Sequence, residues 1–132
     1  MIDITYSNAT RSELVTDSFF STIRKTLKKY GITDNVNVDL NLVGVSRMRK
    51  LNREHRHKDY ATDVLSFPIW PNLDTIKKQA AVGPVMLGGI VVCLAVATKE
   101  AAEEGKSVNE QINFLIDHSC LHLMGFHHEG DE

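Results

Sequence analysis

The chain has 132 residues, of which 42% are hydrophobic and 24% are charged, and its formal net charge is -2 at pH 7. This length suits one domain with a real core and leaves no room for a second of typical size, so residues 1–132 are expected to form a single domain. The composition is that of a globular protein and disfavours both a disordered chain and a membrane protein.

The expected location follows from three absences in the sequence. No apolar run approaches the roughly 20 residues that span a bilayer, and the first ten residues lack the pattern of a signal peptide. The two cysteines, Cys93 and Cys120, form no metal-binding spacing, so they are interpreted as small apolar residues in a reducing compartment. We therefore expect a cytoplasmic protein.

Periodic patterns divide the first half of the chain into alternating elements. Apolar and polar residues alternate over residues 2–6 and 36–42, which predicts two strands with one buried face each. Between them, apolar residues recur with helical spacing over residues 13–30. Ser46 resembles an N-cap and predicts a short helix to about His55.

The middle of the chain contains a predicted strand and a predicted loop. Residues 62–69 are rich in β-branched and aromatic side chains, and Pro68 is expected to end this strand or place it at a sheet edge. Residues 71–84 show no sustained period and are expected to form an exposed loop.

The last third is expected to contain one strand and two helices. Residues 86–94 resemble a buried strand, in which Gly88 permits a bulge or a close backbone approach. A helix over residues 95–105 follows, and Ser107 with Glu110 forms a capping box that begins the last helix. The order of elements predicts an α+β fold, a small mixed sheet of about four strands packed with helices.

Histidines are concentrated in the segment HSCLHLMGFHH, residues 118–128. His118 and His122 are four residues apart on the predicted helix, so both side chains project from one face and can share an ion. Gly125 stands where a helix commonly ends in a left-handed residue, which lets the chain return His128 toward the same ion. His127 is the competing third ligand, but the spacing from Gly125 favours His128.

Three neutral imidazoles favour zinc and leave one tetrahedral position for water, as in catalytic zinc sites. Metzincin proteases share this spacing, with a general-base glutamate after the first histidine. Here that residue is Ser119, which cannot accept a proton near neutral pH. A peptidase is therefore disfavoured.

A basic segment, residues 47–58, suggests the substrate. Arg56 and Lys58 lie past the expected helix end, where loop residues can face a cleft, and arginine binds phosphate through two parallel hydrogen bonds. A positive cleft beside an open metal site indicates a phosphodiester. Three other cations of the segment are interpreted as a solvated helix face: Arg47, Arg49 and Lys50.

Three segments, NREHRHKDYATDVLSFP, MLGGIVV and HSCLHLMGFHH, together resemble the YbeY family of bacterial and organellar metal-dependent endoribonucleases linked to ribosomal RNA maturation. The resemblance implies a four-stranded mixed sheet with helices. It also implies that His118, His122 and His128 bind one zinc ion, that Arg56 is catalytic or binds phosphate, and that His118 also takes part in catalysis.

The chain departs from the family pattern at three positions near this site. Gly89 and His127 stand where the family usually has aspartate, and Ser119 stands where it usually has glycine. Loss of two acids can change how the metal ligands are supported. Asp63 is the nearest carboxylate in the motif, and it either supports the ligands, acts as a base, or caps the turn before its strand.

The leading hypothesis is a zinc-dependent, single-strand-selective endoribonuclease in ribosomal RNA maturation and ribosome quality control. The ion would activate water or polarise a phosphate oxygen while Arg56 and Lys58 neutralise the growing charge. Its partners would be single-stranded or ribosomal RNA, ribosomal proteins and ribosome-associated factors, with no membrane. The alternatives are a peptidase-like hydrolase and a non-catalytic RNA- or ribosome-binding factor whose zinc stabilises the fold.

Overall fold

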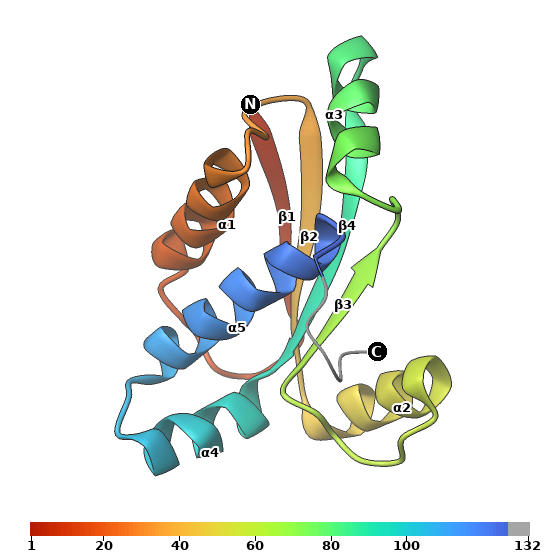
Figure 1. The fold of residues 1–132 in the computed structure, drawn as a ribbon. Coiled ribbons are helices and arrows are strands. Elements are labelled where there is room, and N and C mark those ends of the chain that lie inside the picture. Colours follow the sequence, from red (N-terminus) through yellow and green to blue (C-terminus); the bar gives the residue numbers. More distant parts are fainter. Residues whose placement is uncertain (127–132) are drawn as a thin grey trace.

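A computed structural model describes residues 1–126, in which four strands form one mixed sheet flanked by five helices (Figure 1). The strands are β1 (Ile2–Asn8), β2 (Val36–Val43), β3 (Val64–Pro68) and β4 (Val85–Cys93). The helices are α1 (Asp17–Lys29), α2 (Val45–Arg56), α3 (Leu73–Val82), α4 (Leu94–Glu104) and α5 (Val108–Leu123). The predicted α+β class and the mixed sheet are confirmed.

The strands are ordered β1-β2-β4-β3 in the sheet. Strands β1, β2 and β4 are parallel, and β3 pairs antiparallel with β4 at one edge. Pro68 is the last residue of β3, opposite Gly88 of β4. This confirms that the proline ends a strand at the sheet edge. Because β3 has a neighbouring strand on one side only among the described residues, the missing N–H of the proline is tolerated there.

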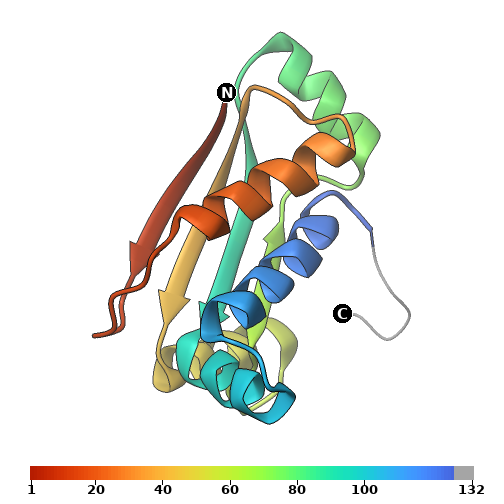
Figure 2. The same cartoon turned by 90° about the vertical axis from the view of Figure 1, so that its left-hand side faces the viewer.

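Helices cover the two faces of the sheet unequally. Helices α1 and α5 lie across one face (Figure 2) and bury its apolar side chains, including Val38, Leu40 and Ile90. Alternate residues of a strand point to opposite faces. A smaller cluster therefore lies on the other face, where Met48 of α2 packs with four strand residues: Val43, Leu65, Val91 and Cys93.

A bulge in β4 brings the sheet close to α5. Asn37 pairs with Met86 and Val38 with Gly88, so Leu87 is the extra residue. At Gly88, φ is +151°, and a Cβ there would stand 2.6 Å from the carbonyl oxygen of Phe67 and 2.8 Å from a methyl of Leu123. The expected close approach at this glycine is confirmed, and it sets the spacing between β3, β4 and α5.

The loop expected over residues 71–84 is wrong, because Leu73–Val82 form helix α3. The Asn72 side chain accepts a hydrogen bond of 2.8 Å from the Thr75 backbone N–H and so caps the helix. Asp74 and Lys78 form an ion pair across one turn. Ile76 is the one residue of this helix that is fully buried, which is too little apolar periodicity to detect in the sequence.

Two predicted helix starts are also wrong. Gly44, and not Ser46, is the N-cap of α2, so Ser46 lies inside the first turn. Helix α1 begins at Asp17, four residues later than expected, and the preceding Val15 is 73% exposed. The start of α5 is confirmed: Ser107 and Glu110 make both hydrogen bonds of the capping box.

Both cysteines are buried and free, as expected of small apolar residues. Burial, together with the charge of Asp117, raises the pKa of the Cys120 thiol to about 12, so this sulfur stays protonated near neutral pH. Across residues 1–126, none of the helices has the length and apolar character needed to cross a bilayer.

Replacing Gly88 by alanine should destabilise the fold by about 1–3 kcal/mol, because the new methyl group would collide with the backbone of Phe67. Urea denaturation followed by circular dichroism would measure the free energy of unfolding. Gly83→Ala is the matched control, since a Cβ at Gly83 would meet nothing within 4 Å. Equal stability of the two variants would contradict this account of the β4–α5 spacing.

Candidate active site

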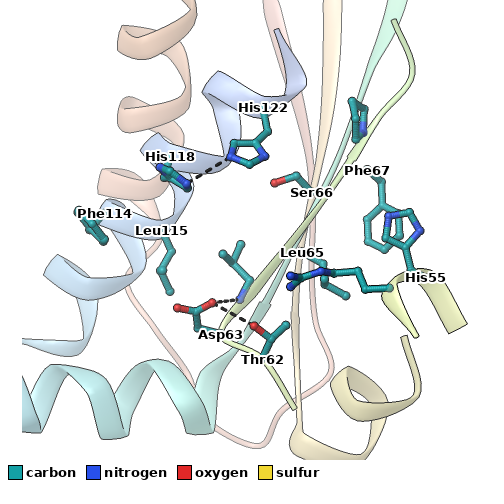
Figure 3. Close-up of a pocket in the computed structure, with 13 residues that line it drawn as sticks. His55, Thr62, Asp63, Leu65, Ser66, Phe67, Phe114, Leu115, His118 and His122 are labelled. Carbon is teal, nitrogen blue, oxygen red and sulfur yellow. Dashed lines mark hydrogen bonds between the residues drawn. The ribbon is translucent and has the colours of Figure 1, made fainter. Parts of the chain in front are cut away.

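A pocket of about 540 Å³ lies between α5, β3 and the end of α2 (Figure 3). This volume is within the range of small-ligand sites. Helix α2 contributes His55 and Arg56, and α5 contributes Phe114, Leu115, His118 and His122. The segment from Thr62 to Pro68 forms the remaining wall.

His118 and His122 converge in this pocket, as the four-residue spacing predicts. Both rings are half-buried, and their Nε2 atoms are 3.2 Å apart. Two nitrogen ligands of a tetrahedral zinc ion, each about 2.05 Å from the metal, would be roughly 3.3 Å apart. The two nitrogens are therefore separated by about the distance expected between two ligands of one tetrahedral zinc ion. Imidazole nitrogens are also ordinary zinc ligands.

The expected third ligand, His128, and its competitor, His127, lie outside the described residues. Within residues 1–126 no group of three metal-binding side chains comes together. The turn that would return the chain is nevertheless present. Gly125 has a φ of +92°, and the Phe126 N–H bonds to the carbonyl of Leu121, which closes the end of α5.

The turn at Gly125 depends on the helix that sequence patterns missed. A Cβ at Gly125 would stand 3.0 Å from both the Asn72 Cα and the Pro71 carbonyl oxygen. The glycine thus packs against the capped start of α3. The direction in which the chain leaves α5 is set by this contact as well as by the backbone angle.

Arg56 lines the pocket, but not as a residue beyond the helix. It is the last residue of α2, because His57 adopts the left-handed conformation with a φ of 60° and ends the helix there. The Nε of Arg56 is buried and has no hydrogen-bond partner among the described residues. A buried donor that is not satisfied costs about 1–3 kcal/mol, so an anionic oxygen in the pocket would relieve that cost.

Lys58 is not brought into the pocket. It follows the left-handed residue and is half-buried outside the pocket wall. Other cations of the basic segment are also held elsewhere: Arg49 and Arg53 both contact the carboxylate of Asp59, at 2.9 and 3.3 Å. Arg56 is therefore the single lysine or arginine among the residues that line the described pocket.

Asp63 lies at the base of the pocket, below the two histidines in Figure 3. Its Oδ1 accepts a hydrogen bond of 2.7 Å from the Val64 N–H, so it caps the start of β3, one of the roles considered for it. Burial, the charge of Asp63 and a hydrogen bond between the two carboxyls raise the pKa of Glu100 in α4. Glu100 in turn accepts a hydrogen bond from the buried Gln111 of α5.

Two serines connect the walls of the pocket. The hydroxyls of Ser66 in β3 and Ser119 in α5 are 2.5 Å apart, and Ser119 is fully buried. Ser119 is the residue that stands where the family pattern has glycine, and it is occupied in this contact. Its position after His118 therefore provides a structural link and not a base.

Sequence reasoning missed several residues that line the pocket. Ser66 lies in the strand motif three residues after Asp63, and its uncharged side chain gives no sign in the sequence that it faces a site. Phe114 is four residues before His118, and this helical spacing was an available signal. Nothing in the sequence indicates Glu100, because its contact with Asp63 depends on how α4 packs.

The chain is similar in sequence to several known proteins. A model of the family described as Endoribonuclease YbeY matches residues 3–132. A protein named Endoribonuclease YbeY from Pseudomonas putida is 44% identical over 93 residues, 70% of this chain and 55% of that protein. One of the same name from Pseudomonas fluorescens is 40% identical over 100 residues, 76% of this chain and 62% of that protein. The chain thus spans little more than half the length of these relatives.

Among solved structures, the solution structure of a Thermotoga maritima protein is similar over 100% of this chain and 77% of the other. The TM-score is 0.62 and the sequence identity is 26%. This agreement supports the α+β fold independently of the motifs.

Replacing Glu100 by glutamine should increase stability relative to the parent as the pH rises. A carboxyl whose pKa is raised by folding binds its proton more tightly in the folded state, so the parent loses stability as the pH rises from the unfolded pKa through the folded one. The glutamine variant has no such loss. Thermal unfolding between pH 4 and pH 8 measures the difference, with Glu103→Gln, an exposed position of α4, as the control. If the difference in stability between parent and Glu100→Gln stayed constant with pH, the raised pKa of Glu100 would be contradicted.

Proposed function

The chain belongs to the endoribonuclease YbeY family, and on that premise we propose that it is a zinc-dependent endoribonuclease that cleaves single-stranded RNA. One observation carries the proposal. Two histidines whose Nε2 atoms are 3.2 Å apart share a pocket with Arg56, whose buried Nε has no acceptor among the described residues. A pair of metal-binding groups beside an unsatisfied guanidinium suits a phosphodiester.

In this proposal His118, His122 and His128 hold the zinc ion. When bound, zinc supplies a Lewis acid that can polarise a phosphate oxygen and lower the pKa of water. Arg56 binds the phosphate through its planar guanidinium and stabilises the negative charge that grows on it during cleavage. Asp63, which caps β3 from the base of the pocket, keeps that wall in place beneath the phosphate.

Three further roles belong to the same proposal. Lys58 contacts the RNA backbone beyond the pocket, and His127 supports the metal ligands. The natural substrate is ribosomal RNA, which is cleaved in the cytoplasm during ribosome maturation and quality control. Ribosomal proteins or ribosome-associated factors are the protein partners. A peptidase is disfavoured, since the residue after His118 is the buried Ser119, which is already hydrogen-bonded to Ser66.

Cleavage of a labelled single-stranded RNA should fall about 10²- to 10³-fold in Arg56→Ala, because charge stabilisation by the guanidinium is lost. His118→Ala should lose cleavage to a similar or greater extent. Arg47→Ala is the matched control, as an exposed arginine of the same helix that does not line the pocket. Rate constants come from gel analysis of a time course.

Variants purified identically expose contaminating ribonuclease, the main artefact of this assay. Equal cleavage by the parent, Arg56→Ala and His118→Ala would assign the activity to a contaminant. No cleavage by zinc-loaded parent protein would reject the enzyme and favour an RNA-binding role.

Removing zinc with a chelator should stop cleavage and leave most of the fold intact. Among the described residues, the core formed by α1, α5 and the sheet consists of apolar side chains, and we expect it to hold together without the ion. Far-UV circular dichroism and cleavage would be followed in the same sample before and after zinc is restored. Unfolding on chelation would instead indicate a structural metal, as in the non-catalytic alternative.

A further inference from the structure

Phe114 is an exposed aromatic residue at the rim of the pocket. It is 58% exposed and lines the pocket one helical turn before His118. Four large apolar residues of α5 are buried in the core, with 4% exposure or less: Ile112, Leu115, Ile116 and Leu123. A single exposed apolar residue is common on protein surfaces, and Phe114 differs from that ordinary case in its surroundings.

A cation contacts the ring of Phe114. The Lys106 Nζ lies 4.7 Å from the ring centroid, within the range of cation–π attraction. The same ammonium is 3.4 Å from the Oε1 of Gln111, which is buried in α5. A positive charge thus stands beside the ring of Phe114 at the rim of the pocket.

The opposite wall of the pocket carries two further rings, inclined to each other by 45°. The rings of His55 and Phe67 are 4.5 Å apart, and both residues line the pocket. In Figure 3, Phe114 lies on one side of the pocket and this pair on the other, with His118, His122 and Ser66 between them. A phosphate at the histidines would therefore have a planar group on either side.

We propose that Phe114 stacks on the base of a nucleotide next to the phosphate bound at His118, His122 and Arg56, and that this contact selects unpaired RNA. The inference rests on the proposed function, since it names how the same site reads its substrate. Base stacking on an aromatic side chain needs a base that is free of its duplex neighbours, as in single-stranded RNA. A base inside a duplex is stacked on both faces and cannot reach the ring.

The test uses zinc-loaded protein and a labelled single-stranded RNA with one cleavage site. Phe114→Ala should weaken RNA affinity, measured by fluorescence anisotropy, roughly 5- to 150-fold, the size of one lost base stack. It should raise KM by a similar factor and change kcat less. Phe114→Tyr, which keeps the ring, should stay close to the parent. Tyr60→Ala, at an aromatic residue that is 52% exposed outside the pocket wall, is the control.

A set of RNAs that each lack one base identifies the stacked nucleotide. In the parent, removing the base beside the cleaved phosphate should weaken binding by the same factor as Phe114→Ala. In Phe114→Ala, removing that base should have no further effect. Additive losses in the doubly altered complex, or unchanged affinity in Phe114→Ala, would overturn the proposal and leave the ring as a contact for a protein partner.

Failure of the inference is distinct from failure of the proposed function. If the parent cleaves RNA, Arg56→Ala does not, and Phe114→Ala behaves as the parent, the endoribonuclease stands and the stacking role is rejected. If the parent neither binds nor cleaves the RNA, both are rejected. Matching circular dichroism spectra and melting temperatures would establish that the alanine variant folds, as the exposure of the side chain leads us to expect.

Discussion

The burial of one face of α5 determines where the pocket residues lie. Ile112, Ile116, Cys120 and Leu123 follow the helical period and pack against α1 and the sheet. Because the helix has 3.6 residues per turn, this packing leaves the stripe from Phe114 through His118 to His122 at the margin of the buried face. The histidines are half-buried for that reason, and they face β3 instead of solvent. The convergence of His118 and His122 is thus a consequence of core packing.

Two close contacts hold α5 in register with its surroundings. Gly88 in the β4 bulge lets Leu123 and the Phe67 carbonyl approach, and the hydroxyls of Ser66 and Ser119 join β3 to the helix. At Gly88 the missing side chain allows the backbone and Leu123 to come close. At Ser66 and Ser119 the two hydroxyls bond to each other. Together they keep β3, which supplies one wall of the pocket, at a constant distance from the histidines on the other.

The parts of the fold that could be predicted are those with strong periodicity or a reciprocal cap. The alternation in β2 and the capping box of Ser107 with Glu110 each specify one structure locally. Helix α3 could not be predicted in this way, since it buries only Ile76 fully and takes its stability from Asn72 and from tertiary contacts. The N-cap at Gly44 was missed because no side chain caps that helix, whereas Ser46 has the chemistry of a cap without the position.

The site was predictable where it depends on spacing along one helix and not where distant segments meet. His118 and His122 needed only the helical period. Arg56 and Lys58 are two residues apart and looked equivalent in sequence, yet the left-handed turn at His57 separates their directions. Ser66 with Ser119, and Asp63 with Glu100, become neighbours only through the packing of β3 and α4 against α5. Such pairs require three-dimensional information.

The position of β3 at the edge of the sheet has a consequence for self-association. An edge strand presents unpaired backbone groups that can add a strand from another molecule, a common start of aggregation. In the described part of the chain β3 pairs with β4 alone. Its five residues and its terminal Pro68 leave few N–H donors in line, so it is a poor template for such addition. The wall that opens the pocket to a ligand therefore resists the intermolecular strand pairing that an open edge invites.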